Sequence, residues 1–147
     1  MPATKFRTQV KAAAGFVADE LFTAATDLSS RQYYFVVAGA VAGEVTVATG
    51  ASNPTPLGVL QNAPTASTLA RVRIFGKTTL QASPNSCNIG YGRFISCNAC
   101  GGGISSLENA CVTLGRWLSA STATCTTGTA FINCAGFSGS TPGGTAS

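Results

Sequence analysis

The chain has 147 residues, a length typical of one domain, and only 10% of them are charged, against about 25% in an average soluble domain. It contains no histidine, which removes the commonest general base and metal ligand, and its acidic residues include one adjacent pair, Asp19 and Glu20. This composition argues against an enzyme.

Nine basic and five acidic residues give a net charge of +4, and the basic residues are scattered along the chain. Nucleic-acid binding needs a basic stripe, so we expect no nucleic-acid partner. We interpret Arg71 and Arg73 as the solvated face of one strand. A surface so poor in charge is either covered by partner subunits or kept hydrated by Ser, Thr, Asn and Gly. A mild positive charge also suits docking on an acidic protein surface.

The two ends of the chain differ in composition from its centre. Residues 1–26 are predicted to form an N-terminal arm, extended over 1–15, with a short helix within 16–26. Residues 138–147, SGSTPGGTAS, have the composition of a flexible tail. No apolar run approaches the ~18 residues of a membrane span, and no export signal is visible, so we expect no membrane partner and synthesis in a cytoplasm.

Between the ends, residues 27–137 are predicted to form a single β domain. Aromatic and β-branched runs, period-two alternation and turn residues recur at spacings of roughly 8–12 residues, as in a sandwich or barrel. Gly76 is expected to kink or bulge one strand, and Gly101 to Gly103 to form a flexible turn. The predicted strands lie at 33–37, 44–49, 57–61, 70–75, 77–80, 91–97, 112–118 and 128–134.

A pattern occurs twice within this domain. Leu57-Gly58 opens a segment closed by Gly76, and Leu114-Gly115 opens one closed by Gly136. Superposing the closing glycines aligns Ile132 with Val72 and Cys134 with Ile74. We therefore predict a pseudo-repeat of about 27–80 and 84–137. The predicted fold is all-β: a small antiparallel β-barrel or sandwich of two similar halves, with an extended N-terminal arm.

Six cysteines lie in the second half of the chain and none in the first, so they are not essential to the repeated fold. Two or three disulfides, reduced small apolar residues and a metal site are three open interpretations. Cys97 and Cys100 have the spacing of a zinc knuckle or redox pair, but the other spacings are irregular. The six are Cys87, Cys97, Cys100, Cys111, Cys125 and Cys134.

Four motifs in this order resemble the small capsid decoration (cement) proteins of tailed bacteriophages. The likeness covers about residues 27–134; the cysteine-bearing region 84–111 and Trp117, where a small residue is usual, depart from it. The motifs are Asp27–Tyr33 (DLSSRQY), Leu57–Pro64 (LGVLQNAP), Ala70–Gly76 (ARVRIFG) and Leu114–Ala120 (LGRWLSA).

The resemblance implies a homotrimeric, non-enzymatic protein without a cofactor. It would be made in the host cytoplasm and bound to the major capsid protein on the outer surface of the virion. In the N-terminal arm we expect contacts with the capsid or a neighbouring subunit. An alternative is a host-surface binding module or head-fibre base displayed on the virion. The expected contact residues are Lys5, Phe6, Arg7, Val10 and Lys11.

Overall fold

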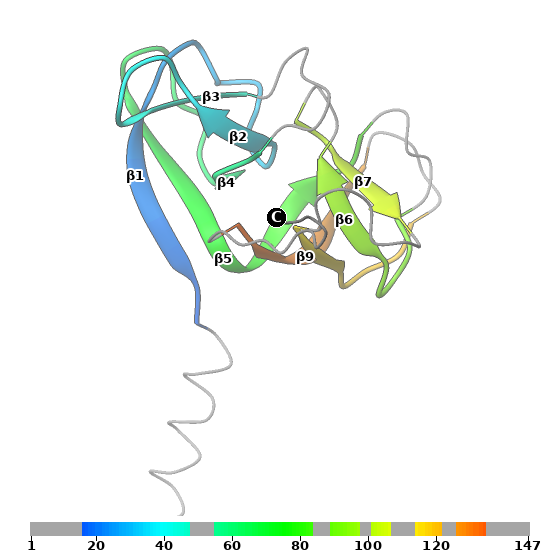
Figure 1. The fold of residues 1–147 in the computed structure, drawn as a ribbon. Coiled ribbons are helices and arrows are strands. Elements are labelled where there is room, and N and C mark those ends of the chain that lie inside the picture. Colours follow the sequence, from blue (N-terminus) through cyan, green and yellow to red (C-terminus); the bar gives the residue numbers. More distant parts are fainter. Residues whose placement is uncertain are drawn as a thin grey trace, which may run out of the picture.

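The computed structural model describes residues 16–47, 55–83, 89–97, 101–106, 114–121 and 126–134, and within these ranges the chain is all-β, as predicted (Figure 1). The nine strands belong to one hydrogen-bonded sheet that curls into two lobes sharing β5. They are β1 (Ala18–Ala24), β2 (Phe35–Ala38), β3 (Glu44–Val47), β4 (Gly58–Leu60), β5 (Leu69–Gln81), β6 (Phe94–Cys97), β7 (Gly103–Ser106), β8 (Gly115–Trp117) and β9 (Thr127–Asn133).

The short helix predicted within 16–26 is wrong, because Ala18–Ala24 forms strand β1. This strand pairs antiparallel with β5 and in parallel with β3, so its backbone groups are satisfied by neighbours distant in sequence. Ala24 is buried and Leu21 is 63% exposed. Tertiary pairing therefore overrides a weak helical spacing of apolar residues.

The first lobe is a closed ring of five strands. The order is β1, β3, β2, β4 and β5, and β5 returns to β1. Every pairing in the ring is antiparallel except the short one between β1 and β3. Closure removes exposed sheet edges. Its core holds Ala24, Leu28, Val36, Val45, Val47, Leu60, Ala70 and Val72.

The second lobe repeats this ring with β5, β9, β8, β6 and β7. A parallel bridge between Ala82 and Gly103 joins the end of β5 to β7, as β1 joins β3 in the first lobe. The sequence analysis missed β7, because Gly103 was assigned to a turn. The most deeply buried apolar side chains of this lobe are Leu80, Ile95, Trp117, Ala130 and Ile132.

The two lobes are equivalent pair by pair. In the first lobe β1 pairs with the first half of β5, and in the second lobe the second half of β5 pairs with β9. Equivalent pairs lie 58 residues apart in the sequence. The pair Glu20–Val72 of the first lobe corresponds to Thr78–Ala130 of the second, and Phe22–Ala70 corresponds to Leu80–Gly128. The repeat therefore starts at β1 and shares β5, whereas the sequence analysis began it at residue 27.

The predicted alignment of the repeats is displaced by two residues. In the strand pairings Val72 corresponds to Ala130, whereas superposition of the closing glycines aligns it with Ile132. A shift of two keeps every side chain on its own face of a strand, so the inward face was still assigned correctly. Ala130 and Ile132 are both fully buried.

The duplicated Leu-Gly pairs have a steric cause. A Cβ on Gly58 would overlap the carbonyl oxygen of Arg73, and a Cβ on Gly115 would overlap that of Phe131. Arg73 and Phe131 occupy equivalent places in the two lobes. Each glycine thus lets a short strand, β4 or β8, lie very close to the backbone of its paired neighbour, β5 or β9.

The second lobe packs against the outside of the first. Phe35 and Val59, on β2 and β4, belong to the same buried cluster as the core of the second lobe and are fully buried. The Phe35 amide donates to the carbonyl oxygen of Gly101 at 2.8 Å, and Gln61 Nε2 donates to Thr78 Oγ1 at 2.8 Å. Gly101 is therefore a buried contact residue rather than part of a loose turn.

An ion pair fastens β1 to β5. Asp19 accepts hydrogen bonds from Arg73 Nε at 2.8 Å and Nη2 at 3.1 Å, and Arg71 lies 3.6 Å away. The Arg73 side chain is only 17% exposed, so the interpretation of Arg73 as a solvated residue is wrong. The hydrogen bonds from Arg73 hold the pKa of Asp19 below its ordinary value, against the opposing effect of partial burial.

Trp117 should be a principal source of stability in the second lobe. It is fully buried, so Trp117→Ala should lower the free energy of unfolding by about 3–5 kcal/mol. Trp117→Phe should cost much less, because Trp117 Nε1 has no hydrogen-bond acceptor in the described part of the chain. Tyr91→Ala, at a side chain 74% exposed, is the control and should stay within about 0.5 kcal/mol. Urea denaturation measures all three; equal losses at Trp117 and Tyr91 would contradict the assignment.

Asp19→Asn should lower the free energy of unfolding at neutral pH by about 1–3 kcal/mol, since it removes charge-assisted hydrogen bonds. The pKa of Asp19 is depressed in the folded state, so its contribution is present above the unfolded pKa of about 3.9 and is lost as the pH falls through the folded value. Denaturation curves of wild type and variant should therefore converge in acid. Glu20→Gln, at an exposed neighbour, is the control. A constant difference at every pH would argue against the ion pair.

Candidate functional site

The residues predicted from the N-terminal arm as contacts, Lys5, Phe6, Arg7, Val10 and Lys11, lie outside the described residues. Their role stays a prediction. Four of the six cysteines, Cys87, Cys100, Cys111 and Cys125, also lie outside. The candidate site must therefore be built from the surface of the two rings.

Cys97 and Cys134 lie in the described part, and no disulfide joins them. Both pack against the core of the second lobe. Burial raises the pKa of the Cys134 thiol to about 12, because the thiolate would lose its hydration. Cys134 thus fits the interpretation of a reduced, small apolar residue. The described residues contain no group of three or more histidine, cysteine or carboxylate side chains that could hold a metal.

Several polar side chains of the described part make structural contacts. Asp19 is held by Arg73. Hydrogen bonds to Asp27 from the Ser29 side chain and from the Ser29 backbone amide, the latter at 3.0 Å, lower the pKa of Asp27. Gln61 bonds the carbonyl oxygen of Val59 and the hydroxyl of Thr78. Within the described ranges, the protein has no helix of the length and apolarity that crossing a membrane would need.

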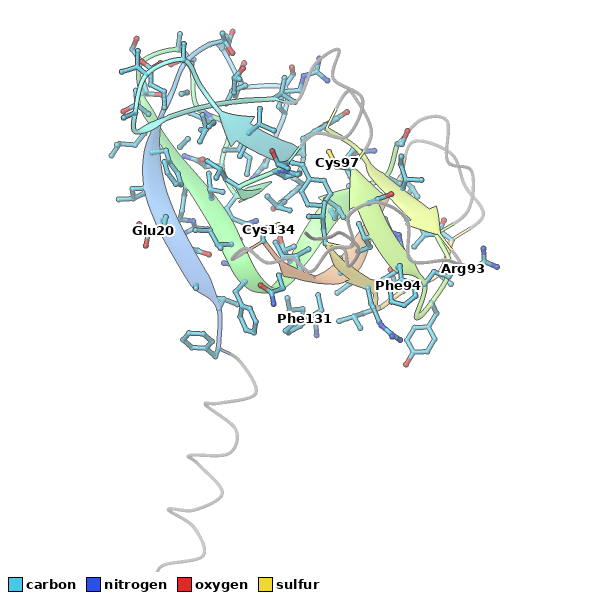
Figure 2. The ribbon with its side chains drawn as sticks, viewed as in Figure 1. Glu20, Arg93, Phe94, Cys97, Phe131 and Cys134 are labelled. Atoms are coloured by element: carbon cyan, nitrogen blue, oxygen red, sulfur yellow. The ribbon has the colours of Figure 1, made fainter. Side chains whose placement is uncertain are left out.

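The outer side of the second lobe carries an apolar and cationic surface, which we call the open face: Phe94, Arg116, Leu118 and Phe131. Direct cross-strand pairing places Arg116 between Phe94 and Phe131, on adjacent strands. Leu118 is 40% and Phe131 39% exposed. Figure 2 shows Phe94 and Phe131 on the same side of the molecule.

Contacts within the open face keep its side chains in place. The Arg116 guanidinium carbon lies 4.6 Å from the centre of the Phe94 ring, a cation–π arrangement. Phe131 meets Phe75 edge to face, with ring centres 5.2 Å apart, and Phe75 meets Phe16 at 6.1 Å. Ordered aromatic rings beside an arginine are the side chains enriched where proteins contact one another.

The sequence analysis missed the open face, although the repeat could have revealed it. Arg116 occupies the place of Val59, which lies on the outer side of the first lobe and is fully buried under the second lobe. An arginine at the position of a buried valine is a signal that the two outer surfaces have different surroundings. The signal lies in the outward-facing residues of the repeats, whereas the predicted alignment rested on the inward-facing ones.

The raised pKa of Cys134 predicts that its thiol reacts slowly with alkylating reagents in the folded protein. At pH 8 a pKa of about 12 leaves a thiolate fraction of about 10⁻⁴, so alkylation by iodoacetamide should be about 10³-fold slower in the folded protein than in urea. Peptide mapping by mass spectrometry follows Cys134 separately from the other cysteines. Equal rates in folded and unfolded protein would show that the thiol is accessible and ionised.

No family model and no curated protein matches the sequence. Solved structures do match the fold. The N base of the head fiber gp8.5 of bacteriophage phi29 has a TM-score of 0.58 and 12% identity, and covers 81% of this chain and 96% of that chain. A chain from the capsid of Myoviridae phage XM1 has a TM-score of 0.56 and 14% identity, with coverage of 82% and 85%.

These identities are low, so the likeness is one of fold. It nevertheless spans about four fifths of this chain, and therefore includes both lobes rather than one barrel. The resemblance to capsid-associated bacteriophage proteins, predicted from four sequence motifs, is confirmed at the level of the fold. The chain has the fold of solved bacteriophage head components.

Proposed function

We propose that the protein is a structural component of a bacteriophage virion, a decoration protein that binds the outer surface of the head shell and stabilises it. The observation that carries this proposal is the likeness, over most of the chain, to solved components of two phage heads. The order of the four sequence motifs supports it independently.

The physical basis of such a role is added contact area. A decoration protein that bridges neighbouring capsid subunits buries surface that the shell alone leaves exposed, and each buried Å² of apolar surface contributes about 25 cal/mol. Each contact can be weak if several copies act together, because linked contacts gain avidity. The closed rings of this chain provide a compact support, and we propose that the protein assembles as a homotrimer on the major capsid protein.

We propose that the N-terminal arm, with Lys5, Phe6, Arg7, Val10 and Lys11, supplies one of these contacts. The described chain begins at Phe16, which packs on Phe75 of β5, one residue before Gly76 at the junction of the two lobes. Three basic residues in the first eleven of the arm suit an acidic patch on the shell.

The base of a head fibre is the second candidate. One solved neighbour is described as the N base of a head fiber, and the alignment covers 96% of that chain. A base of this kind would also sit on the shell, but it would carry a further module or bind the host surface. Binding to shells therefore supports both roles, and binding to host cells separates them.

Purified protein should bind expanded shells that lack it, saturably and at a fixed number of copies per particle. Co-sedimentation measures occupancy, and heating of the shells measures stabilisation. Deletion of residues 1–15 should lower the apparent affinity for shells by about 10²-fold, because every subunit loses one of several linked contacts. Circular dichroism should show the same β signal for both forms.

Two results would contradict this proposal. Absence of saturable binding to shells would exclude the decoration role, and binding to host cells without binding to shells would favour a host-surface module. Unchanged occupancy after deletion of 1–15 would remove the arm from the contact while leaving the decoration role in place.

A further inference from the structure

The two lobes present equivalent outer surfaces in different surroundings. In the first lobe this surface is covered by the second lobe: Phe35 and Val59 are fully buried, and Gln61 is 8% exposed. In the second lobe nothing in the described part of the chain covers it. The equivalent residues, in the same order, are Phe94, Arg116 and Leu118, which belong to the open face.

The surface that does the covering is also present twice. In the second lobe it includes Thr78, Leu80 and Gly101, all buried against or beside the first lobe. The residues equivalent to these in the first lobe are Glu20, Phe22 and Gly43, which we call the free face. Glu20 and Gly43 are exposed and Phe22 is half-buried.

Among the described residues, the chain is thus a stack of two units with neither end covered: the open face lies at one end and the free face at the other. We propose that the open face binds the free face of a second copy of this chain, repeating between copies the contact that joins the two lobes within one copy. This inference gives residues to the self-association proposed above, and it rests on that proposal.

The charges of the two faces support a second copy as the occupant. Within one chain this contact is neutral, with Val59 on one side and Thr78 on the other, where Thr78 accepts the hydrogen bond of Gln61. At the uncovered ends Arg116 stands at the place of Val59, and Glu20 stands at the place of Thr78. Repeating the contact therefore brings Arg116 of one copy near Glu20 of the next, an attractive pair.

The same charges, Arg116 on the open face and Glu20 on the free face, disfavour other arrangements of two copies. Two open faces placed together would bring arginines together, and two free faces would bring glutamates together, so like ends repel. A contact between unlike faces is heterologous, and it forms a closed ring when the rotation between copies closes. A ring of three copies is the homotrimer proposed above.

Sedimentation equilibrium of the full chain over a range of concentrations tests this contact without a shell. The wild type should exceed the monomer mass. Leu118→Asp should raise the dissociation constant at least about tenfold, because the new carboxylate would face Glu20 of the next copy, a like charge. Leu69→Asp is the matched control: Leu69 is 62% exposed and lies in neither face. It should associate as the wild type does.

A charge exchange provides the second arm. Arg116→Glu and Glu20→Lys should each weaken association, and the double variant should recover most of it, because opposite charges meet again. Thermal unfolding of each variant checks the fold; if Leu118→Asp unfolds, the charge exchange decides.

Three outcomes would overturn the inference: a wild type that stays monomeric at all concentrations, equal association of Leu118→Asp and Leu69→Asp, or a double variant no better than the single ones. A monomer that needs Leu118 for binding to shells would mean that the capsid covers the open face. That result would leave the decoration role intact.

Discussion

The architecture depends on a single strand, β5, which both rings use. Its first half closes the first ring against β1 and β4, and its second half opens the second ring against β9. Gly76 lies between the halves with a φ of +116°, and a Cβ there would meet Val17 at 2.8 Å. A glycine is therefore needed where the strand passes from one ring to the other. Because the strand is continuous, both lobes belong to one hydrogen-bonded sheet.

A shared strand has consequences for what the protein can do. The inner faces of both rings are filled by apolar side chains, and the polar groups near the junction are engaged in structural bonds such as Asp19 to Arg73 and Gln61 to Thr78. What remains available is the outside of the stack. The two barrels share one strand and a buried contact, so they present their outer surfaces together, as the decoration role proposed above would require.

Much of this architecture was predictable from local patterns. The alternation of Ala70 to Phe75 predicted the first half of β5, and the duplicated Leu-Gly pairs predicted two similar halves, because the steric need at Gly58 recurs at Gly115. Helical spacing misled at Ala18–Ala24, where pairing with β5 decides the structure. Strand β7 was not predicted, because glycine and serine, three of its four residues, have low β propensity. Its position is set by pairing with β6. Cross-strand pairing is set by distant residues, which local patterns do not contain.

The open face was beyond such patterns for a related reason. Phe131 and Leu118 resemble ordinary core residues in sequence. Only the assembled rings show that their equivalents are covered, whereas no described residue covers Phe131 and Leu118 in the same way. A reconstruction of expanded shells incubated with the protein would test the central claim most directly. We expect discrete density on the outer surface at fixed lattice positions, resolved as two barrels per copy. Particles with no added density, or with the protein inside the shell, would contradict it.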